Sequence, residues 1–136
     1  MSEATEQPAV RVLVVDDEFV VRDFVSRILR QAGYQTETAS DSGVALRIAE
    51  ESPSLDLLVT DVKMPGASGA DLARVLLRRN PHLKVLFLTG YADSLDQDRM
   101  TTSQQAILSK PCSIAQLLHA VSLILFGHIR GLEAAR

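Results

Sequence analysis

Polar side chains stand at the ends of four apolar segments of this chain. They are Asp16 and Asp17 after the first segment, Asp61 after the second, Thr89 after the third and Lys110 after the fourth. Mg²⁺ prefers oxygen ligands such as carboxylates, while a hydroxyl and an ammonium can hold the oxygens of a phosphoryl group. If the fold brings these residues together, their types predict a site for a divalent cation and a phosphoryl group.

The apolar segments themselves have the composition of buried strands. They are short and rich in branched aliphatic residues, as expected for parallel strands that are covered on both faces. We expect such strands over Val10–Val15, Leu55–Thr60, Val85–Leu88 and Ala106–Ser109. The segment Tyr34–Ala39 is more polar, which predicts a strand at the edge of the sheet.

Helical patterns lie between these strands. Apolar residues recur at helical spacing from Val21 to Ala32, and Gly33 is expected to end that helix. The other expected helices are one that starts at Asp41, one that Ser68 caps and that runs to Arg79, and one that starts near Ser113 and ends at Gly127. The segment Asp93–Gln105 has only two large apolar residues, and we expect a short or mobile helix there.

Strands that alternate with helices predict right-handed crossovers and an open parallel sheet. All strands of such a sheet end at one edge, and ligands bind at this carboxyl edge. We therefore expect the polar residues at the strand ends to meet there. A flexible lead over residues 1–8, one domain over residues 9–127 and a tail over residues 128–136 complete the expected organisation.

The composition is that of one ordinary globular domain. The chain has 136 residues, of which 46% are hydrophobic, and a formal net charge of −3, so we expect neither nucleic acid nor a membrane as a direct partner. The single Cys112 excludes an internal disulfide and is typical of a reducing compartment. The first eight residues are too polar for a signal peptide, so we expect a cytoplasmic location.

Four short motifs make the chain resemble the receiver domain of response regulators, the CheY-like module of two-component signalling. They are Val-Val-Asp-Asp at 14–17, Thr-Asp-Val-Lys-Met-Pro-Gly at 60–66, Leu-Thr-Gly-Tyr at 88–91 and Ser-Lys-Pro at 109–111. The match covers about residues 9–127. It implies an α/β fold: a flavodoxin-like, doubly wound sheet of five parallel strands in the order 2-1-3-4-5, with five helices.

The resemblance implies a role for each acidic residue. Asp61 would accept the phosphoryl group. Asp17 and Asp61 would ligate Mg²⁺ directly, together with the backbone carbonyl of Lys63, and Asp16 would act mostly through water. Two roles stay open: Glu18 could strengthen the cation site or favour the start of the next helix, and the Lys63 side chain could tune access to the site or be a solvated loop residue.

The resemblance also implies a conformational switch. Thr89 and Lys110 would contact the phosphoryl oxygens, and Thr89 would gain a hydrogen bond that only the phosphorylated state offers. Many receivers carry Tyr or Phe three residues before the lysine, where this chain has Ile107. We therefore expect a readout that differs from the usual one, with Tyr91 as a candidate gate. The Lys110–Pro111 peptide bond is usually cis in this family.

The leading hypothesis is a cytoplasmic receiver that uses Mg²⁺ to take a phosphoryl group from a histidine kinase or a histidine phosphotransfer protein onto Asp61. It would promote only its own phosphorylation and dephosphorylation, and so is not a conventional enzyme. The alternatives are an interaction module that is not phosphorylated and a receiver module of a hybrid histidine kinase. A hydrolase or nucleotide-binding protein is disfavoured, because the chain has neither G-x-G-x-x-G nor a Walker sequence.

Signalling would require an unknown downstream protein, because residues 128–136 are too few for a helix-turn-helix that could bind DNA. The last expected helix is more apolar than one buried face requires. We expect Leu123 and Phe126 to form a candidate surface for a homodimer or another partner. Burial of these two residues under the tail is the alternative.

Overall fold

The computed structural model describes residues 9–52, 54–90 and 104–127. Five parallel strands form one sheet in the order β2-β1-β3-β4-β5. The strands are β1 (Arg11–Val15), β2 (Gln35–Ala39), β3 (Leu57–Thr60), β4 (Lys84–Thr89) and β5 (Gln105–Ser109). The helices of the described ranges are α1 (Phe19–Gln31), α2 (Ser42–Glu51), α3 (Gly69–Arg79) and α5 (Ile114–Phe126).

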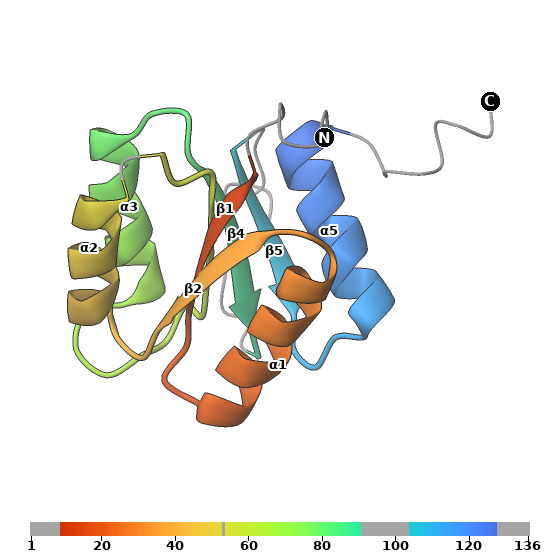
Figure 1. The fold of residues 1–136 in the computed structure, drawn as a ribbon. Helices are drawn as coiled ribbons and strands as arrows, with labels where there is room; N and C mark the ends of the chain where they lie inside the picture. The colour runs from red at the N-terminus through yellow and green to blue at the C-terminus, as the bar shows by residue number, and fades with distance from the viewer. Residues whose placement is uncertain (1–8, 53, 91–103, 128–136) are drawn as a thin grey trace.

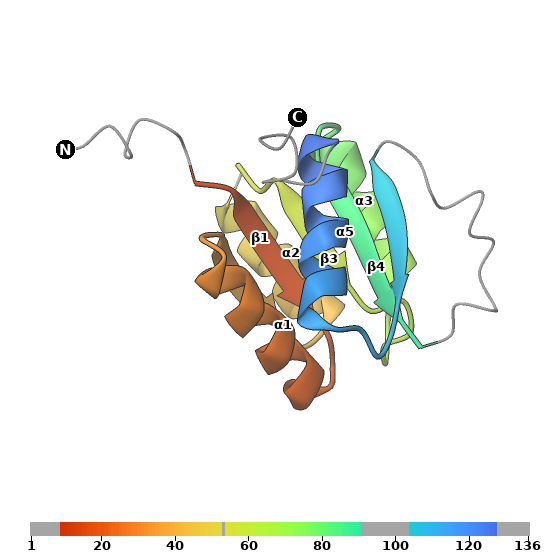
Figure 2. The same ribbon diagram turned by 90° about the vertical axis from the view of Figure 1, so that its right-hand side faces the viewer.

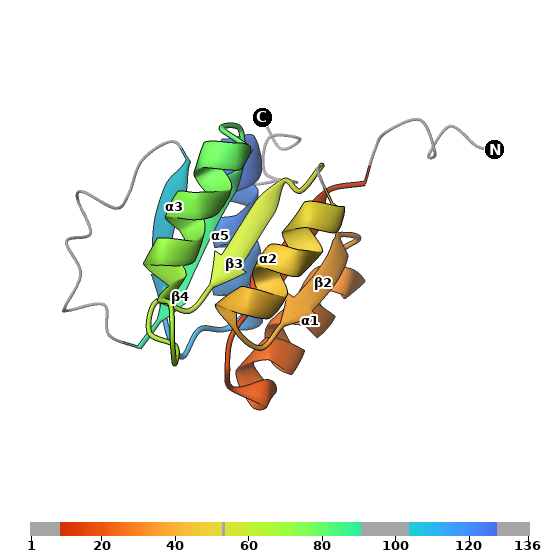
Figure 3. The same cartoon turned by 90° about the vertical axis from the view of Figure 1, so that its left-hand side faces the viewer.

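The sheet is covered on both faces. Figure 1 shows α2 and α3 on one face and α1 and α5 on the other. Figure 2 views the molecule from the side of α5, and Figure 3 from the side of α2 and α3. Two apolar cores result, one under each pair of helices. This arrangement confirms the predicted doubly wound sheet and its strand order.

Burial along the strands follows their places in the sheet. Every residue of β3 is buried, and so are the last four residues of β1, because helices cover both faces of these central strands. In contrast, the first four residues of β2 alternate between exposed and partly buried, and only Ala39 is buried. This strand lies at the edge of the sheet, as its polar sequence predicted.

Local sequence signals set the helix ends. The side chains of Asp41, Ser68 and Ser113 each accept a hydrogen bond from the backbone of the first turn of their helix, at 2.8, 3.1 and 3.0 Å. Ser113 and Gln116 form a reciprocal capping box at the start of α5. Gly127 ends α5 with a positive φ of 75°, a backbone conformation that glycine adopts without strain.

Two apolar residues are more exposed than the apolar pattern of their helices predicts. Phe24 and Ile114 are part of the apolar patterns of α1 and α5, but their exposed fractions are 39% and 54%. Ile114 is the first residue of α5, and Phe24 is the sixth residue of α1. Leu123 is exposed, as expected, while Phe126 is half-buried and packs against the core under α1 and α5.

Some expectations lie outside the described residues. These are the lead over residues 1–8, the tail over residues 128–136, Tyr91, and all of the expected helix up to residue 103. The expected helix was wrong at its last residue, because Gln105 belongs to strand β5. No helix in the described ranges is long and apolar enough to cross a membrane.

Candidate functional site

The sheet register brings the predicted site residues to one edge. Val15 of β1 is paired with Thr60 of β3, so the next residues along the chain, Asp16 and Asp61, are neighbours. The backbone N–H of Asp61 donates to the carbonyl of Val15 at 3.0 Å, which extends the pairing one residue past the strands. On the far side, the N–H of Lys110 donates to the carbonyl of Thr89 at 2.9 Å. The carboxyl ends of four strands therefore position the site.

One ammonium lies among three carboxylates at this edge. The Nζ atom of Lys110 is 3.2 Å from Asp61 Oδ2, 3.3 Å from Asp16 Oδ2 and 3.5 Å from Glu18 Oε1. The side chains of Asp16 and Asp61 are almost fully buried, whereas that of Glu18 is 64% exposed and lies at the mouth. Three carboxylates against one ammonium leave an excess of negative charge, which a divalent cation would offset.

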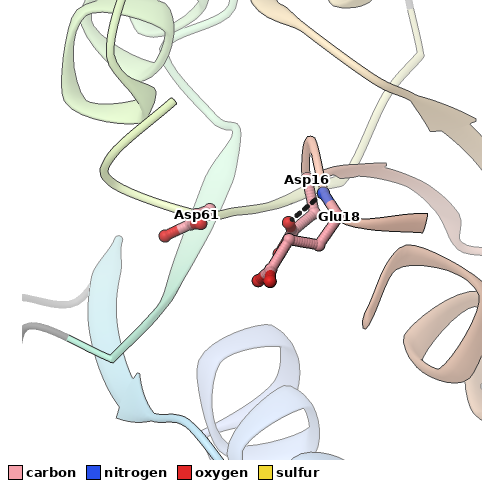
Figure 4. Close-up of side chains that lie close together, drawn as sticks. All are labelled: Asp16, Glu18 and Asp61. Atoms are coloured by element: carbon pink, nitrogen blue, oxygen red, sulfur yellow. Dashed lines mark hydrogen bonds between the residues drawn. The ribbon is translucent and has the colours of Figure 1, made fainter. Parts of the chain in front are cut away.

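The carboxylate oxygens are close enough to share an ion. Asp16, Glu18 and Asp61 each offer one oxygen, and these three atoms lie within 4.8 Å of one another (Figure 4). Asp61 Oδ1 is buried and has no hydrogen-bond partner in the described part of the chain. Such an orphaned acceptor costs free energy unless another group satisfies it. An all-oxygen donor set with an unsatisfied oxygen fits Mg²⁺.

The other predicted site residues lie as follows. Thr89 is fully buried at the end of β4, beside the strand that leads to Lys110. Asp17 is exposed and is not part of the three-carboxylate group, and its expected role as a direct ligand stays a prediction. Lys63 is also exposed. Ile107 on β5 is half-buried and packs against the core under α2 and α3.

Burial and charge act in opposite directions on the two ionisable groups at the centre. Burial raises the pKa of Asp16 above its ordinary value, although the backbone N–H of Glu18, at 2.9 Å, and Lys110 oppose this. For Lys110, burial alone would lower the pKa, but the carboxylates of Asp16 and Asp61 hold the pKa above its ordinary value. The ammonium therefore stays charged at neutral pH.

Cys112 lies two residues beyond Lys110 and is half-buried. Burial raises the pKa of its thiol, with only partial opposition from Lys110, so the thiol stays protonated at neutral pH. A protonated, half-buried thiol is a poor nucleophile, so Cys112 is best described as a packing residue near the site. The peptide bond that precedes it by one residue, Lys110–Pro111, is cis, as the family resemblance implied.

The raised pKa of Asp16 predicts that Asp16→Asn makes the metal-free protein more resistant to urea at pH 7. A carboxyl whose pKa is higher in the folded state destabilises that state increasingly as pH rises from its unfolded value, about 3.9, through its folded value. The neutral Asn avoids this penalty. Urea unfolding without divalent cations should give a higher midpoint for the variant at pH 7 and a smaller difference at pH 3. A lower midpoint at pH 7 would contradict the prediction.

A glycine that the sequence pattern did not single out lies against the expected acceptor. A Cβ atom on Gly69 would come within 1.8 Å of the backbone oxygen of Asp61 and 2.9 Å of Thr60 Oγ1. The N–H of Gly69 donates to the carbonyl of Val62 at 2.8 Å, and the hydroxyl of Thr60 donates to the carbonyl of Asp61 at 2.9 Å. The first turn of α3 thus packs directly on the backbone that carries Asp61. The signal for this contact in the sequence was the glycine at the first position of the helix that Ser68 caps.

The comparisons with known proteins agree on one family. The family model described as the response regulator receiver domain matches residues 12–122. The response regulator receiver protein CpdR of Brucella abortus is 32% identical over 116 residues, which are 85% of this chain and 96% of that protein. The probable transcriptional regulatory protein TcrX of Mycobacterium tuberculosis is 39% identical, over 87% of this chain and 50% of that protein.

A sensor kinase and two solved structures show the same similarity. The sensor kinase CckA of Brucella abortus is 36% identical, over 84% of this chain but only 12% of that protein. The crystal structure of the receiver domain from the hybrid histidine kinase CckA has a TM-score of 0.71 and 35% identity, covering 85% of this chain and 98% of that one. A receiver domain from Clostridium thermocellum has a TM-score of 0.74 and 29% identity, covering 93% and 99%.

Proposed function

The chain belongs to the response regulator receiver domain family of two-component signal transduction, and from this membership we propose that Asp61 accepts the phosphoryl group. The observation that carries the assignment is the environment of its carboxylate. Oδ1 is buried without a hydrogen-bond partner in the described part of the chain, while Oδ2 lies 3.2 Å from Lys110 Nζ. A buried carboxylate with one unsatisfied oxygen and an adjacent fixed cation suits nucleophilic attack on phosphorus.

Positioning and charge stabilisation would carry the reaction. An oxygen of Asp61 forms the new O–P bond while the N–P bond of a phosphohistidine donor breaks, and the imidazole that leaves takes up a proton. Lys110 offsets the negative charge of the transferring oxygens. The hydroxyl of Thr89 donates a hydrogen bond to the phosphoryl group once that group is attached to Asp61. Mg²⁺ would be held by the carboxylates of Asp16 and Asp61, with Asp17 and the Lys63 carbonyl as the further ligands implied by the family, and would offset negative charge during the transfer.

The functional domain is proposed to span residues 9–127, with a histidine kinase or a histidine phosphotransfer protein as donor. Such a domain promotes its own phosphorylation and dephosphorylation and turns over no separate substrate. The chain is similar both to part of a sensor kinase and to about half of a transcriptional regulator. The proposed function is therefore compatible with a receiver module of a hybrid kinase and with a response regulator. A homodimer through α5 stays a prediction, for which the exposed Leu123 offers apolar surface.

The proposed function predicts that the protein gains a single phosphoryl group from a small phosphodonor such as acetyl phosphate when Mg²⁺ is present. Chelation of Mg²⁺ should reduce the gain below detection, because the excess negative charge of the site then repels the anionic donor. Intact mass spectrometry measures the gain directly. If no gain occurs, and a beryllofluoride mimic of the phosphoryl group also fails to bind, the protein is an interaction module that is not phosphorylated.

A further inference from the structure

The exposed carboxylate of Glu18 is the least explained part of the site. The sequence left two roles open for it, a contribution to the cation site or a favourable charge at the start of α1. Glu18 is the N-cap residue of α1, but its side chain makes no capping hydrogen bond to the helix. Instead, its Oε1 lies 3.5 Å from Lys110 Nζ, and its backbone N–H donates to Asp16 Oδ1 at 2.9 Å. Both contacts point to the site.

The cation that the family binds and Lys110 would compete for the same two carboxylates. Lys110 Nζ contacts Asp16 Oδ2 and Asp61 Oδ2 at 3.3 and 3.2 Å. A divalent cation bound between these two carboxylates would repel the ammonium, because like charges a few ångströms apart interact unfavourably at low dielectric. The third carboxylate near Nζ is that of Glu18, which lies on the solvent side.

The geometry of the group gives Glu18 a second connection to the cation. One of its oxygens lies within 4.8 Å of oxygens of both Asp16 and Asp61. An independent observation concerns a member of the same group: Asp61 is only 7% exposed, and its Oδ1 is buried without a hydrogen-bond partner in the described residues. Figure 4 shows Asp16 and Glu18 side by side, across from Asp61.

We propose that Glu18 is the outer carboxylate of the cation site, where it raises the affinity for Mg²⁺ and keeps Lys110 beside the site when the cation is bound. The proposal rests on the proposed function only in that the site binds a divalent cation. It gives Glu18 a role in addition to those that the family pattern gives to Asp16, Asp17 and Asp61. Glu18 acts through the cation and Lys110, and is therefore a positioning residue.

Isothermal titration of the full chain with Mg²⁺, without a phosphodonor, tests the proposal. Glu18→Gln keeps the shape of the side chain and removes its charge. The dissociation constant for Mg²⁺ should rise about three- to tenfold, the size expected when one partly screened charge near a divalent ion is lost. The difference should shrink at high salt. Glu18→Asp, which keeps the charge, should recover most of the affinity.

Glu51→Gln is the matched control, because it changes the net charge equally and lies at the exposed end of α2. An equal loss of affinity in this control would overturn the proposal, since the effect would then reflect net charge alone. An unchanged dissociation constant for Glu18→Gln, with a lower stability to urea, would also overturn it and assign Glu18 to the start of α1. Failure of the wild type to bind Mg²⁺ would instead contradict the proposed function.

Discussion

Asp61→Asn should abolish the phosphoryl gain while the protein stays folded. The variant keeps the size of the side chain, but its amide is a far weaker nucleophile than a carboxylate. It also removes one of the two buried carboxylates beside Lys110, so the site loses both the acceptor atom and a ligand for the cation. Intact mass after incubation with Mg²⁺ and acetyl phosphate should show the unmodified mass only.

Asp56→Asn is the matched control for this experiment. Asp56 lies just before β3, at the opposite end of that strand from Asp61, is exposed, and accepts a hydrogen bond from the backbone N–H of Arg11 at 2.9 Å. An asparagine there can still accept that bond, so labelling should match that of the wild type. A phosphoryl gain in Asp61→Asn at the wild-type rate would show that another residue is the acceptor. Far-ultraviolet circular dichroism of each variant separates loss of the acceptor from loss of the fold.

Gly69→Ala should destabilise the protein by about 3 kcal/mol or more, a size that marks a severe steric conflict. The added Cβ would lie 1.8 Å from the backbone oxygen of Asp61, far closer than real Cβ contacts. Neither atom belongs to a flexible side chain, so either α3 or the segment that carries Asp61 must move. Urea unfolding measures the loss, and the rate of phosphorylation of the folded fraction should also fall, because the acceptor is displaced.

Gly43→Ala provides a control of opposite sign. Gly43 also lies in the first turn of a helix, but its nearest neighbour would be Asp41 Oδ1 at 3.4 Å, an ordinary contact. Alanine favours the helix over glycine by roughly 0.5–1 kcal/mol, so this variant should be slightly more stable than the wild type. If Gly69→Ala were as stable as Gly43→Ala, α3 would not pack against Asp61 in solution as closely as the structure shows.

Much of the fold could be predicted from the sequence because the relevant signals are local. Apolar segments that end in polar residues mark parallel strands, and parallel strands end at one edge of a sheet. That rule alone places Asp16, Asp61 and Lys110 at one edge of the sheet. The caps at Asp41 and Ser68 likewise depend on hydrogen bonds between residues three apart in the chain. The strand order, in contrast, came from the resemblance to a family and not from the pattern.

The tertiary structure alone decided which side chains turn into the site and what lies behind it. Three consecutive acids follow β1, and composition gives no preference among them; the path of the loop into α1 turns Asp16 and Glu18 toward Lys110 and leaves Asp17 exposed. The requirement for Gly69 arises because α3 packs onto the backbone of Asp61. Such contacts depend on how elements pack in three dimensions, whereas propensity and periodicity describe only each element by itself.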